Sequence, residues 1–203
     1  MKIRVLICFI AVFAVCAFAW AQQGGLLIDD FETSISGGPD GTADFGAGGS
    51  SSIEVTASSE IKYSGNQSLK VTYDAVSGGY MWVARGFDLD AKNAAWLLKP
   101  EDIIWDKYGA IAFYMYGDDS KAVIAFDIKD SGNEMWRFMI TDDFKGWKRI
   151  ICPFGEFYAR GDWQPDNADK NAELDFPVKS FQFEPRPEVK STLYFDYVEL
   201  IKK

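Results

Sequence analysis

The stretch AIAFYMYGDDSKAVIAFDIKDSGNEMWRFMIT, residues 110–141, decides the fold. It contains three apolar runs, at 110–116, 122–128 and 134–141, with turn residues such as Gly117 and Gly132 between them. Runs of this length that are rich in β-branched and aromatic residues and bounded by Gly, Asp and Asn are typical of β-strands. Residues 110–141 therefore predict three consecutive strands.

The same pattern continues on both sides of this stretch. Seven further short runs have strand character, and they lie at residues 26–32, 53–56, 68–73, 80–87, 147–152, 178–183 and 192–201. Many short strands with such turns indicate an all-β sandwich or barrel, in one domain over residues 22–203. One short helical insertion is predicted at 91–106, where Pro100 suits a first helical turn. A parallel α/β fold is excluded, because it needs helices between successive strands.

Alternation along a strand predicts which side chains share a face. Tyr114 points away from Phe113, Gln182 points away from the phenylalanines beside it, and Tyr80 shares a face with Trp82. The polar and aromatic faces are predicted to form the floor of an open groove, with Tyr114, Gln182 and Tyr80 as candidate ligand-binding residues. Large aromatic residues more often lie in the core. Tyr80 is therefore open to both interpretations, and the core is favoured for Trp82.

A loop rich in functional side chains follows the strand that ends at Cys152. Its segment FYARGDWQP, residues 157–165, is interrupted by glycine and proline and is not a regular helix. Aromatic rings stack on apolar C–H faces, while Arg, Asp and amide groups form directional hydrogen bonds. A sugar offers both kinds of surface, so Arg160, Asp162 and Trp163 are predicted to border a carbohydrate-binding cleft. The alternative is a surface turn held by an Arg160–Asp162 ion pair.

The first residues have the pattern of a secretory signal peptide. Lys2 and Arg4 precede an apolar run, and Ala19-Trp20-Ala21 fits a small-residue cleavage site. We assign residues 1–21 to the signal and expect a secreted, periplasmic or extracellular protein that keeps no membrane anchor. The full chain has a net charge of −9. This charge argues against nucleic acid and anionic membranes as partners, because both attract basic surfaces.

Histidine and cysteine usage excludes several kinds of chemistry. The chain has no histidine, and only Cys152 remains once the signal is removed. An intramolecular disulfide is therefore excluded, and so are Ser-His-Asp catalysis and His-ligated zinc. Acidic residues are plentiful, but no spacing singles out the two carboxylates that a glycoside hydrolase needs.

An ordered series of short motifs covers essentially the whole chain after the signal. The motifs are Leu27-Ile28-Asp29-Asp30-Phe31-Glu32, Gly65-x-x-Ser68-Leu69-Lys70-Val71-x-Tyr73, Gly79-Tyr80-x-Trp82, Gly146-Trp147-Lys148, Pro153-Phe154-x-x-Phe157, Arg160-x-Asp162-Trp163-Gln164-Pro165, Leu174-Asp175 and Phe195-Asp196-Tyr197-Val198-x-Leu200. In this order they resemble the family-eleven carbohydrate-binding modules of β-glucan-degrading systems. The resemblance implies a galactose-binding-like β-jelly roll with structural calcium. It also implies a cleft that binds single chains of β-1,4 and mixed-linked β-1,3-1,4 glucans without cleaving them.

The resemblance also implies roles for single residues. Arg160 and Asp162 are expected to hydrogen-bond sugar hydroxyls. Trp163 stands where the family has an aromatic platform, usually Tyr, and Tyr80 matches a second aromatic residue of the cleft.

Acids near both ends of the domain are candidate calcium ligands. Asp30 and Glu32 follow the first strand, and Asp196 lies in the last one. First and last strands commonly lie near each other in such sandwiches, so these acids meet with the turn that contains Asn66. Calcium prefers six to eight oxygen ligands of this kind, roughly. The alternative is that these acids are solvated strand ends.

The sequence therefore predicts a non-catalytic domain that binds β-glucan or a related plant glycan, with a separate glycoside hydrolase as a further partner. A protein-binding or assembly domain of the same fold is the alternative hypothesis. A glycoside hydrolase is the third.

Overall fold

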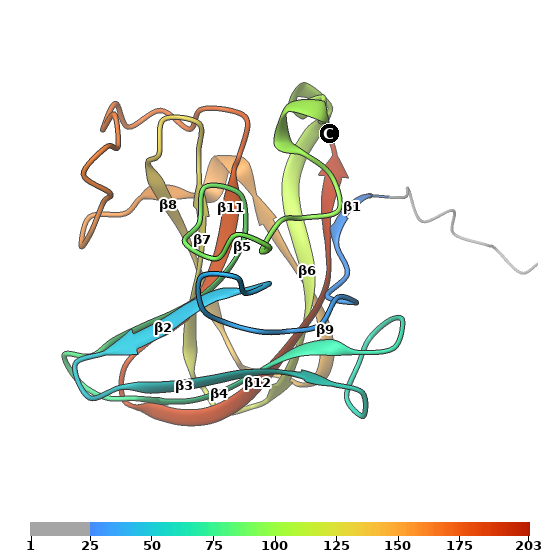
Figure 1. Cartoon of the computed structure of the whole chain (residues 1–203), viewed down its shortest axis with the longest axis vertical. Helices are drawn as coiled ribbons and strands as arrows, with labels where there is room; N and C mark the ends of the chain where they lie inside the picture. The colour runs from blue at the N-terminus through green and yellow to red at the C-terminus, as the bar shows by residue number, and fades with distance from the viewer. Residues whose placement is uncertain (1–24) are drawn as a thin grey trace, which may run out of the picture.

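The protein is a sandwich of two antiparallel β-sheets, seen here in a computed structural model that describes residues 25–203 (Figure 1). The strands of the first sheet are β1 (Leu26–Asp29), β3 (Ser52–Ser58), β4 (Ser68–Ala75), β6 (Tyr108–Asp118), β9 (Lys145–Pro153) and β12 (Val189–Lys202). Those of the second sheet are β2 (Asp44–Gly48), β5 (Tyr80–Gly86), β7 (Val123–Lys129), β8 (Met135–Thr141), β10 (Tyr158–Ala159) and β11 (Ser180–Pro185). The predicted all-β sandwich is confirmed.

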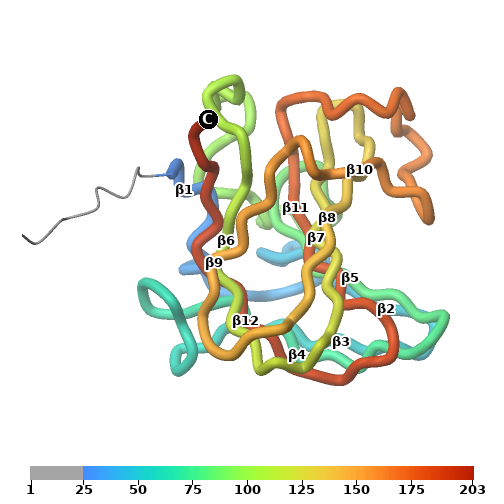
Figure 2. The backbone as a smooth tube through the Cα atoms, turned by 180° about the vertical axis from the view of Figure 1, so that it is seen from behind, coloured from blue at the N-terminus to red at the C-terminus, as the bar shows by residue number. Residues whose placement is uncertain are grey.

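Strands that are neighbours in the sequence often belong to different sheets. The first sheet has the order β3-β4-β12-β6-β9, with β1 paired to β12, and the second has the order β10-β8-β7-β11-β5-β2. Figure 2 shows β6 and β9 on one side of the molecule and β7, β8 and β11 on the other. The three strands predicted from residues 110–141 are β6, β7 and β8. Only β7 and β8 pair with each other, since β6 joins the opposite sheet.

Phenylalanine rings fill the space between the two sheets. Phe113 of β6 lies 4.7 Å from Phe126 of β7 and 4.9 Å from Phe183 of β11, measured between ring centres. Phe183 also stacks on Phe195 of β12 at 3.8 Å. All four side chains are fully buried. Each comes from the apolar face of an alternating strand, so the pattern of the sequence builds the core directly.

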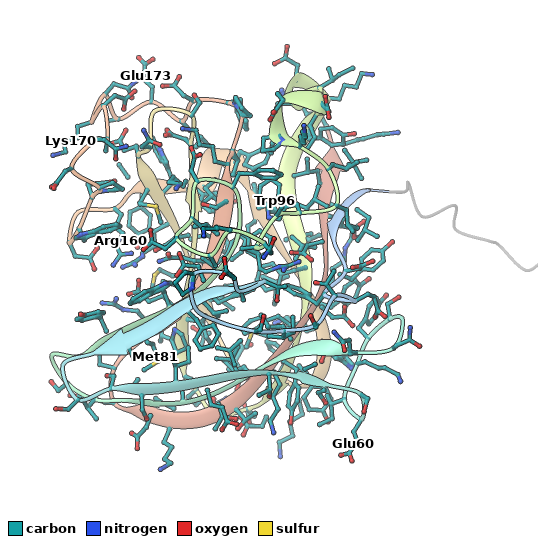
Figure 3. The ribbon with its side chains drawn as sticks, in the orientation of Figure 1. Glu60, Met81, Trp96, Arg160, Lys170 and Glu173 are labelled. Atoms are coloured by element: carbon teal, nitrogen blue, oxygen red, sulfur yellow. The ribbon has the colours of Figure 1, made fainter. Side chains whose placement is uncertain are left out.

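The segment between β5 and β6 contains two 3-10 helices, η1 (Pro100–Asp102) and η2 (Trp105–Lys107), where a short helix was predicted. Pro100 occupies the first turn of η1 as expected. Trp96 points inwards from this segment and stacks on Phe181 of β11 at 5.8 Å (Figure 3). Trp96 therefore anchors the segment to the core, and the segment forms two 3-10 turns in place of a regular α-helix. Within residues 25–203, no helix has the length and apolar character needed to cross a membrane.

Candidate functional site

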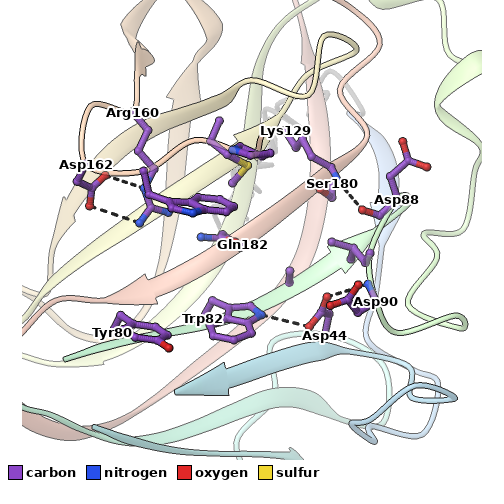
Figure 4. A pocket seen from close by; sticks show the side chains of 15 residues that line it. Asp44, Tyr80, Trp82, Asp88, Asp90, Lys129, Arg160, Asp162, Ser180 and Gln182 are labelled. Atoms are coloured by element: carbon purple, nitrogen blue, oxygen red, sulfur yellow. Dashed lines mark hydrogen bonds and ion pairs between the residues drawn. The ribbon is translucent and has the colours of Figure 1, made fainter. Parts of the chain in front are cut away.

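A cleft of about 690 Å³ lies on the outer face of the second sheet (Figure 4). This is the face that points away from the phenylalanine core, because Gln182 lies between the buried Phe181 and Phe183 on β11. The cleft is lined by Asp44 of β2; Tyr80, Trp82 and Ala84 of β5; Asp88, Leu89 and Asp90 of the next loop; Lys129 of β7; Met135 of β8; Arg160, Asp162, Trp163 and Pro165 of the loop after β10; and Ser180 and Gln182 of β11.

Two aromatic rings form one side of the cleft. Tyr80 and Trp82 are alternate residues of β5, so both point to the cleft face. Their ring centres are 6.2 Å apart and their planes differ by only 13°. Nε1 of Trp82 donates a hydrogen bond of 3.2 Å to Asp44, which also accepts the backbone N–H of Asp90 at 3.0 Å. The ring of Trp82 is therefore held in place by the neighbouring strand.

The loop after β10 forms the opposite side of the cleft. Gln164 fixes this loop to β8, since its amide accepts from N–H of Met135 at 2.7 Å and donates to the Met135 carbonyl at 2.9 Å. The guanidinium of Arg160 lies 5.5 Å from the ring centre of Trp163, within the range of a cation–π contact. Trp163 nevertheless remains 54% exposed. An exposed ring held by a fixed loop is available to stack on a ligand.

A network of charged side chains joins the loop to the floor of the cleft. Asp127 of β7 accepts two hydrogen bonds from Arg137 of β8, at 2.8 and 2.9 Å, and one from Arg160 at 3.0 Å. Glu184 of β11 lies 2.9 Å from the same two guanidinium groups. Gln182 donates to Asp127 at 3.2 Å. The acids and arginines balance one another, and Gln182 lies at their edge, facing the cleft.

The electrostatics of this network keep Asp162 ionised. Burial alone would raise the pKa of Asp162, but the hydrogen bond and charge of Arg160, together with the charge of Arg137, lower it to about 2. Asp162 is therefore ionised at neutral pH and cannot act as a general acid. Asp127 and Glu184 are likewise engaged by arginines. These three carboxylates accept hydrogen bonds and orient the arginines.

Five of the six predicted ligand-binding residues line this one cleft. Arg160, Asp162, Trp163, Tyr80 and Gln182 are brought together from two strands and one loop. The Arg160–Asp162 ion pair, proposed as the alternative explanation of the loop, is also present at 2.7 Å.

Tyr114 is the exception and requires a correction. It lies on β6, in the first sheet, and is buried beneath Tyr63, whose ring stacks on it at 3.4 Å. Its face was predicted correctly, but that face belongs to the opposite sheet. Tyr114 therefore does not line the cleft.

Sequence reasoning missed several residues of the site. Trp82 was favoured as a core residue, whereas the structure places it in the cleft beside Tyr80. The alternation of β5 contained the missing signal, because two residues on one face of a strand share their surroundings. Asp127 was also missed, although an acid between Phe126 and Ile128 in an apolar run is unusual for a strand buried on both faces.

Three of the four predicted calcium ligands, Glu32, Asn66 and Asp196, lie near one another, away from the cleft. Oδ2 of Asp196 accepts the N–H groups of Tyr63 and Ser64 at 2.8 and 3.0 Å. Glu32 accepts from N–H and Nδ2 of Asn66 at 2.8 and 2.9 Å. Asp30 accepts the N–H of Glu32 at 3.1 Å.

One oxygen in this region lacks a hydrogen-bond partner. Oδ1 of Asp196 is buried and accepts nothing, and burial raises the pKa of this carboxyl to about 6 against the hydrogen bonds from Ser64 and Tyr63. A buried, unpartnered carboxylate oxygen fits a bound cation. Within the part of the chain that the structure describes, no three Asp, Glu, His or Cys side chains are grouped to hold a metal. A cation at Asp196 would therefore depend on backbone carbonyls for most of its ligands.

Comparison with known proteins identifies the family. A family model described as carbohydrate binding domain (family 11) matches residues 19–203. The chain belongs to this family. The domain is thus a non-catalytic carbohydrate-binding module, as the resemblance implied.

Solved structures of family-eleven modules share the fold. The module of a cellulosomal cellulase of Clostridium thermocellum superposes with a TM-score of 0.67 at 22% identity, over 89% of this chain and 95% of that one. A module from the same organism, in complex with a β-1,3-1,4-mixed-linked tetrasaccharide, gives 0.68 at 24% identity, over 88% and 96% of the two chains. These similarities confirm the predicted jelly-roll sandwich.

A curated relative is similar to this chain over a small part of its own length. A mannan endo-1,4-beta-mannosidase of Bifidobacterium adolescentis is 29% identical over 144 residues, which is 71% of this chain. The chain spans only 13% of the length of that mannosidase.

Proposed function

We propose that the cleft binds a single chain of β-1,4-linked or mixed-linked β-1,3-1,4 glucan. The observation that carries this proposal is the arrangement of Tyr80 and Trp82 on one side of the cleft, Trp163 on the other, and Gln182 between them. Tyr80 and Trp163 are 58% and 54% exposed, which is unusual for rings that anchor only the fold.

Glucan chemistry matches the two kinds of surface in the cleft. A β-linked glucose ring carries its hydroxyls around its rim and C–H groups on both faces. The faces stack on aromatic rings. The hydroxyls accept hydrogen bonds from Arg160 and donate to Asp162 and to Oε1 of Gln182, whose Nε2 faces Asp127 and Glu184. The ligand is neutral, which agrees with a site whose arginines are already balanced by acids. The mixed-linked tetrasaccharide bound by the structural relative supports the same class of ligand.

Affinity electrophoresis tests this proposal. Residues 22–203 are run in native gels that contain barley β-glucan, hydroxyethylcellulose, xyloglucan, β-mannan or no polysaccharide. We expect retardation by barley β-glucan and hydroxyethylcellulose, which Trp163→Ala abolishes. Leu97→Ala, a control at a residue that is 52% exposed and outside the cleft, should migrate like the wild type. If the folded protein is retarded in none of the gels, the glucan proposal fails and a protein partner becomes the leading hypothesis. Retardation by β-mannan alone would replace glucan with mannan.

We further propose that the module acts outside the cell beside a glycoside hydrolase. The signal-like pattern of residues 1–21, which lie outside the described residues, supports export. The similarity to a family-eleven module of a cellulase and to part of a mannosidase supports the enzyme partner. Mass spectrometry of the exported protein should find a chain that begins at residue 22, and an unprocessed chain in the cells would contradict export.

We also propose that calcium binds at Asp196 and stabilises the fold. The buried, unpartnered Oδ1 of Asp196 supports this proposal, and Glu32 lies close enough to raise the pKa of Asp196 by charge repulsion. Bound calcium would relieve that repulsion between strand β12 and the segment after β1.

A further inference from the structure

Two glycines of β2 lie directly beneath the aromatic side of the cleft. In the register of the second sheet, Gly46 is opposite Trp82 and Gly48 is opposite Tyr80. A methyl group added to Gly46 would lie 2.6 Å from Cη2 of Trp82, and one added to Gly48 would lie 2.4 Å from Cζ of Tyr80. Opposed side chains on neighbouring strands normally stand side by side. Here the far ends of both rings extend over the backbone of β2.

Backbone conformation does not require glycine at these two positions. Two turn glycines at one end of the β2–β5 pair, Gly49 and Gly78, have φ values of +61° and +74°, which favour glycine over other residues. Gly46 and Gly48 do not have a positive φ. Glycine within a strand costs stability and often marks a close approach by another group. At Gly46 and Gly48, the approaching groups are the two rings.

Asp44, the third cleft-facing residue of β2, also contacts one of the rings. Asp44 alternates with Gly46 and Gly48 along the strand and accepts the hydrogen bond from Nε1 of Trp82. Figure 4 shows the rings of Tyr80 and Trp82 in a row along β5, with Asp44 at the end of that row. On the cleft-facing side of β2, Asp44 thus accepts the hydrogen bond from the ring of Trp82. The two glycines leave room for the rings of Trp82 and Tyr80 to lie over the strand.

We propose that Gly46 and Gly48 are positioning residues, which let the rings of Trp82 and Tyr80 lie flat as one continuous floor for two consecutive sugar units of an extended, unbranched β-linked glycan. This inference rests on the proposed function and specifies which part of the ligand this side of the cleft recognises. A ring forced upright would present its edge and not its face, and would lose the stacking contact with the sugar. A side branch on either sugar unit would lift the chain from the floor.

Single alanine substitutions test the positioning role. In Gly46→Ala and Gly48→Ala the added methyl group meets the outer atoms of a ring, which turns away without moving the backbone. We expect melting temperatures close to the wild type, but binding of barley β-glucan about five-fold weaker in isothermal titration calorimetry. Gly155→Ala is the matched control, since a methyl group there meets nothing within 4 Å. It should bind like the wild type.

A double-mutant cycle separates ring positioning from direct contact with the ligand. In a Trp82→Ala background the ring is absent, so Gly46→Ala should cause no further loss of affinity. In a Tyr80→Ala background, Gly48→Ala should likewise cause no further loss of affinity. An equal loss with and without the ring would mean that the methyl group blocks the ligand itself, and would overturn the inference. So would wild-type affinity in both single variants.

The outcome also distinguishes this inference from the proposed function. If barley β-glucan binds the wild type and Trp163→Ala abolishes binding, the proposed function stands whatever the glycine variants do. If the folded wild type does not bind barley β-glucan, the proposed function fails first and the inference fails with it.

Discussion

Asp127 and Arg137 face each other in register on β7 and β8, and two hydrogen bonds of 2.8 and 2.9 Å join them. Both side chains are at least nine-tenths buried. The same Asp127 also accepts hydrogen bonds from Arg160 and Gln182. One buried carboxylate thus contributes to the stability of the second sheet and also orients two residues that line the cleft.

Asp127→Ala should therefore reduce stability and binding together. Removing Asp127 leaves Arg137 and Arg160 to share Glu184 and the partly exposed Asp162. Breaking a buried ion pair in this way costs about 3–5 kcal/mol. Urea unfolding at pH 7 measures the loss. Asp40→Ala, which breaks an ion pair of 3.2 Å between two largely exposed side chains, should change the free energy of unfolding by less than about 0.5 kcal/mol. Equal effects of the two substitutions would contradict the role assigned to Asp127.

Binding should be independent of pH in the range where Asp162 stays ionised. The pKa of Asp162 is about 2 in the folded protein, below the value of about 3.9 expected in an unfolded chain. Its contribution to stability is therefore complete above pH 4 or so and is lost as the pH falls towards 2. Calorimetric titration with β-glucan at pH 5, 6.5 and 8 should give the same affinity. A titration with a midpoint in this range would mean that another group controls binding.

Asp162→Asn offers a second test of the same carboxylate. The substitution keeps the shape of the side chain but removes one of the three carboxylate charges that hold Arg160. We expect weaker binding at all three pH values, with little change in unfolding because the Asp162 side chain is 47% exposed. Wild-type affinity in this variant would show that Arg160 does not depend on Asp162 for its position.

Calcium should raise the melting temperature through Asp196. A ligand at a hundred times its Kd stabilises the native state by about 2.7 kcal/mol, or roughly 5–10 °C for a domain of this size. Scanning calorimetry with calcium, with magnesium and with a chelator measures the shift. Asp196→Asn should lose most of it, because the amide carries no charge for the cation. A shift of the same size in Asp196→Asn, or no shift in the wild type, would rule out a calcium site at this residue.

Period-two alternation predicted the faces of the strands well, because it depends only on local geometry. It placed Tyr80 with Trp82 and separated Gln182 from the core phenylalanines. It could not assign a strand to a sheet, since that depends on pairings between distant segments. Tyr114 illustrates this limit: β6 pairs with β9 and β12, whereas β7, the next strand in the sequence, pairs with β8 and β11. The face of β6 that carries Tyr114 was therefore predicted correctly, but it lies on the opposite side of the molecule from the cleft.

Hydrophobicity alone misplaced Trp82 for a related reason. A large ring in a strand next to Val83 resembles a core residue, and the cross-strand partner shows otherwise. That partner is Gly46, more than thirty positions earlier in the chain. A second signal, besides the alternation of β5, was present in the alternate glycines of residues 44–48, but reading it requires the register between β2 and β5.

Gln182→Glu should weaken binding in a manner that depends on pH. Nε2 of Gln182 lies 3.2 Å from Asp127 and 3.4 Å from Glu184, so a carboxylate in its place would face two others. The guanidinium groups of Arg137 and Arg160 are already engaged by those acids and leave the new charge poorly compensated. Repulsion should raise the pKa of the introduced glutamate well above its usual value.

We expect the affinity of Gln182→Glu for β-glucan to fall about ten-fold or more at pH 7. The affinity should recover in part at pH 5, when the glutamate binds a proton and again donates a hydrogen bond. Gln182→Ala, measured by the same calorimetric titration, should bind a few-fold more weakly than the wild type at both pH values, because it lacks the amide but adds no charge. An equal, pH-independent loss in the two variants would show that charge repulsion in the cleft floor does not govern binding.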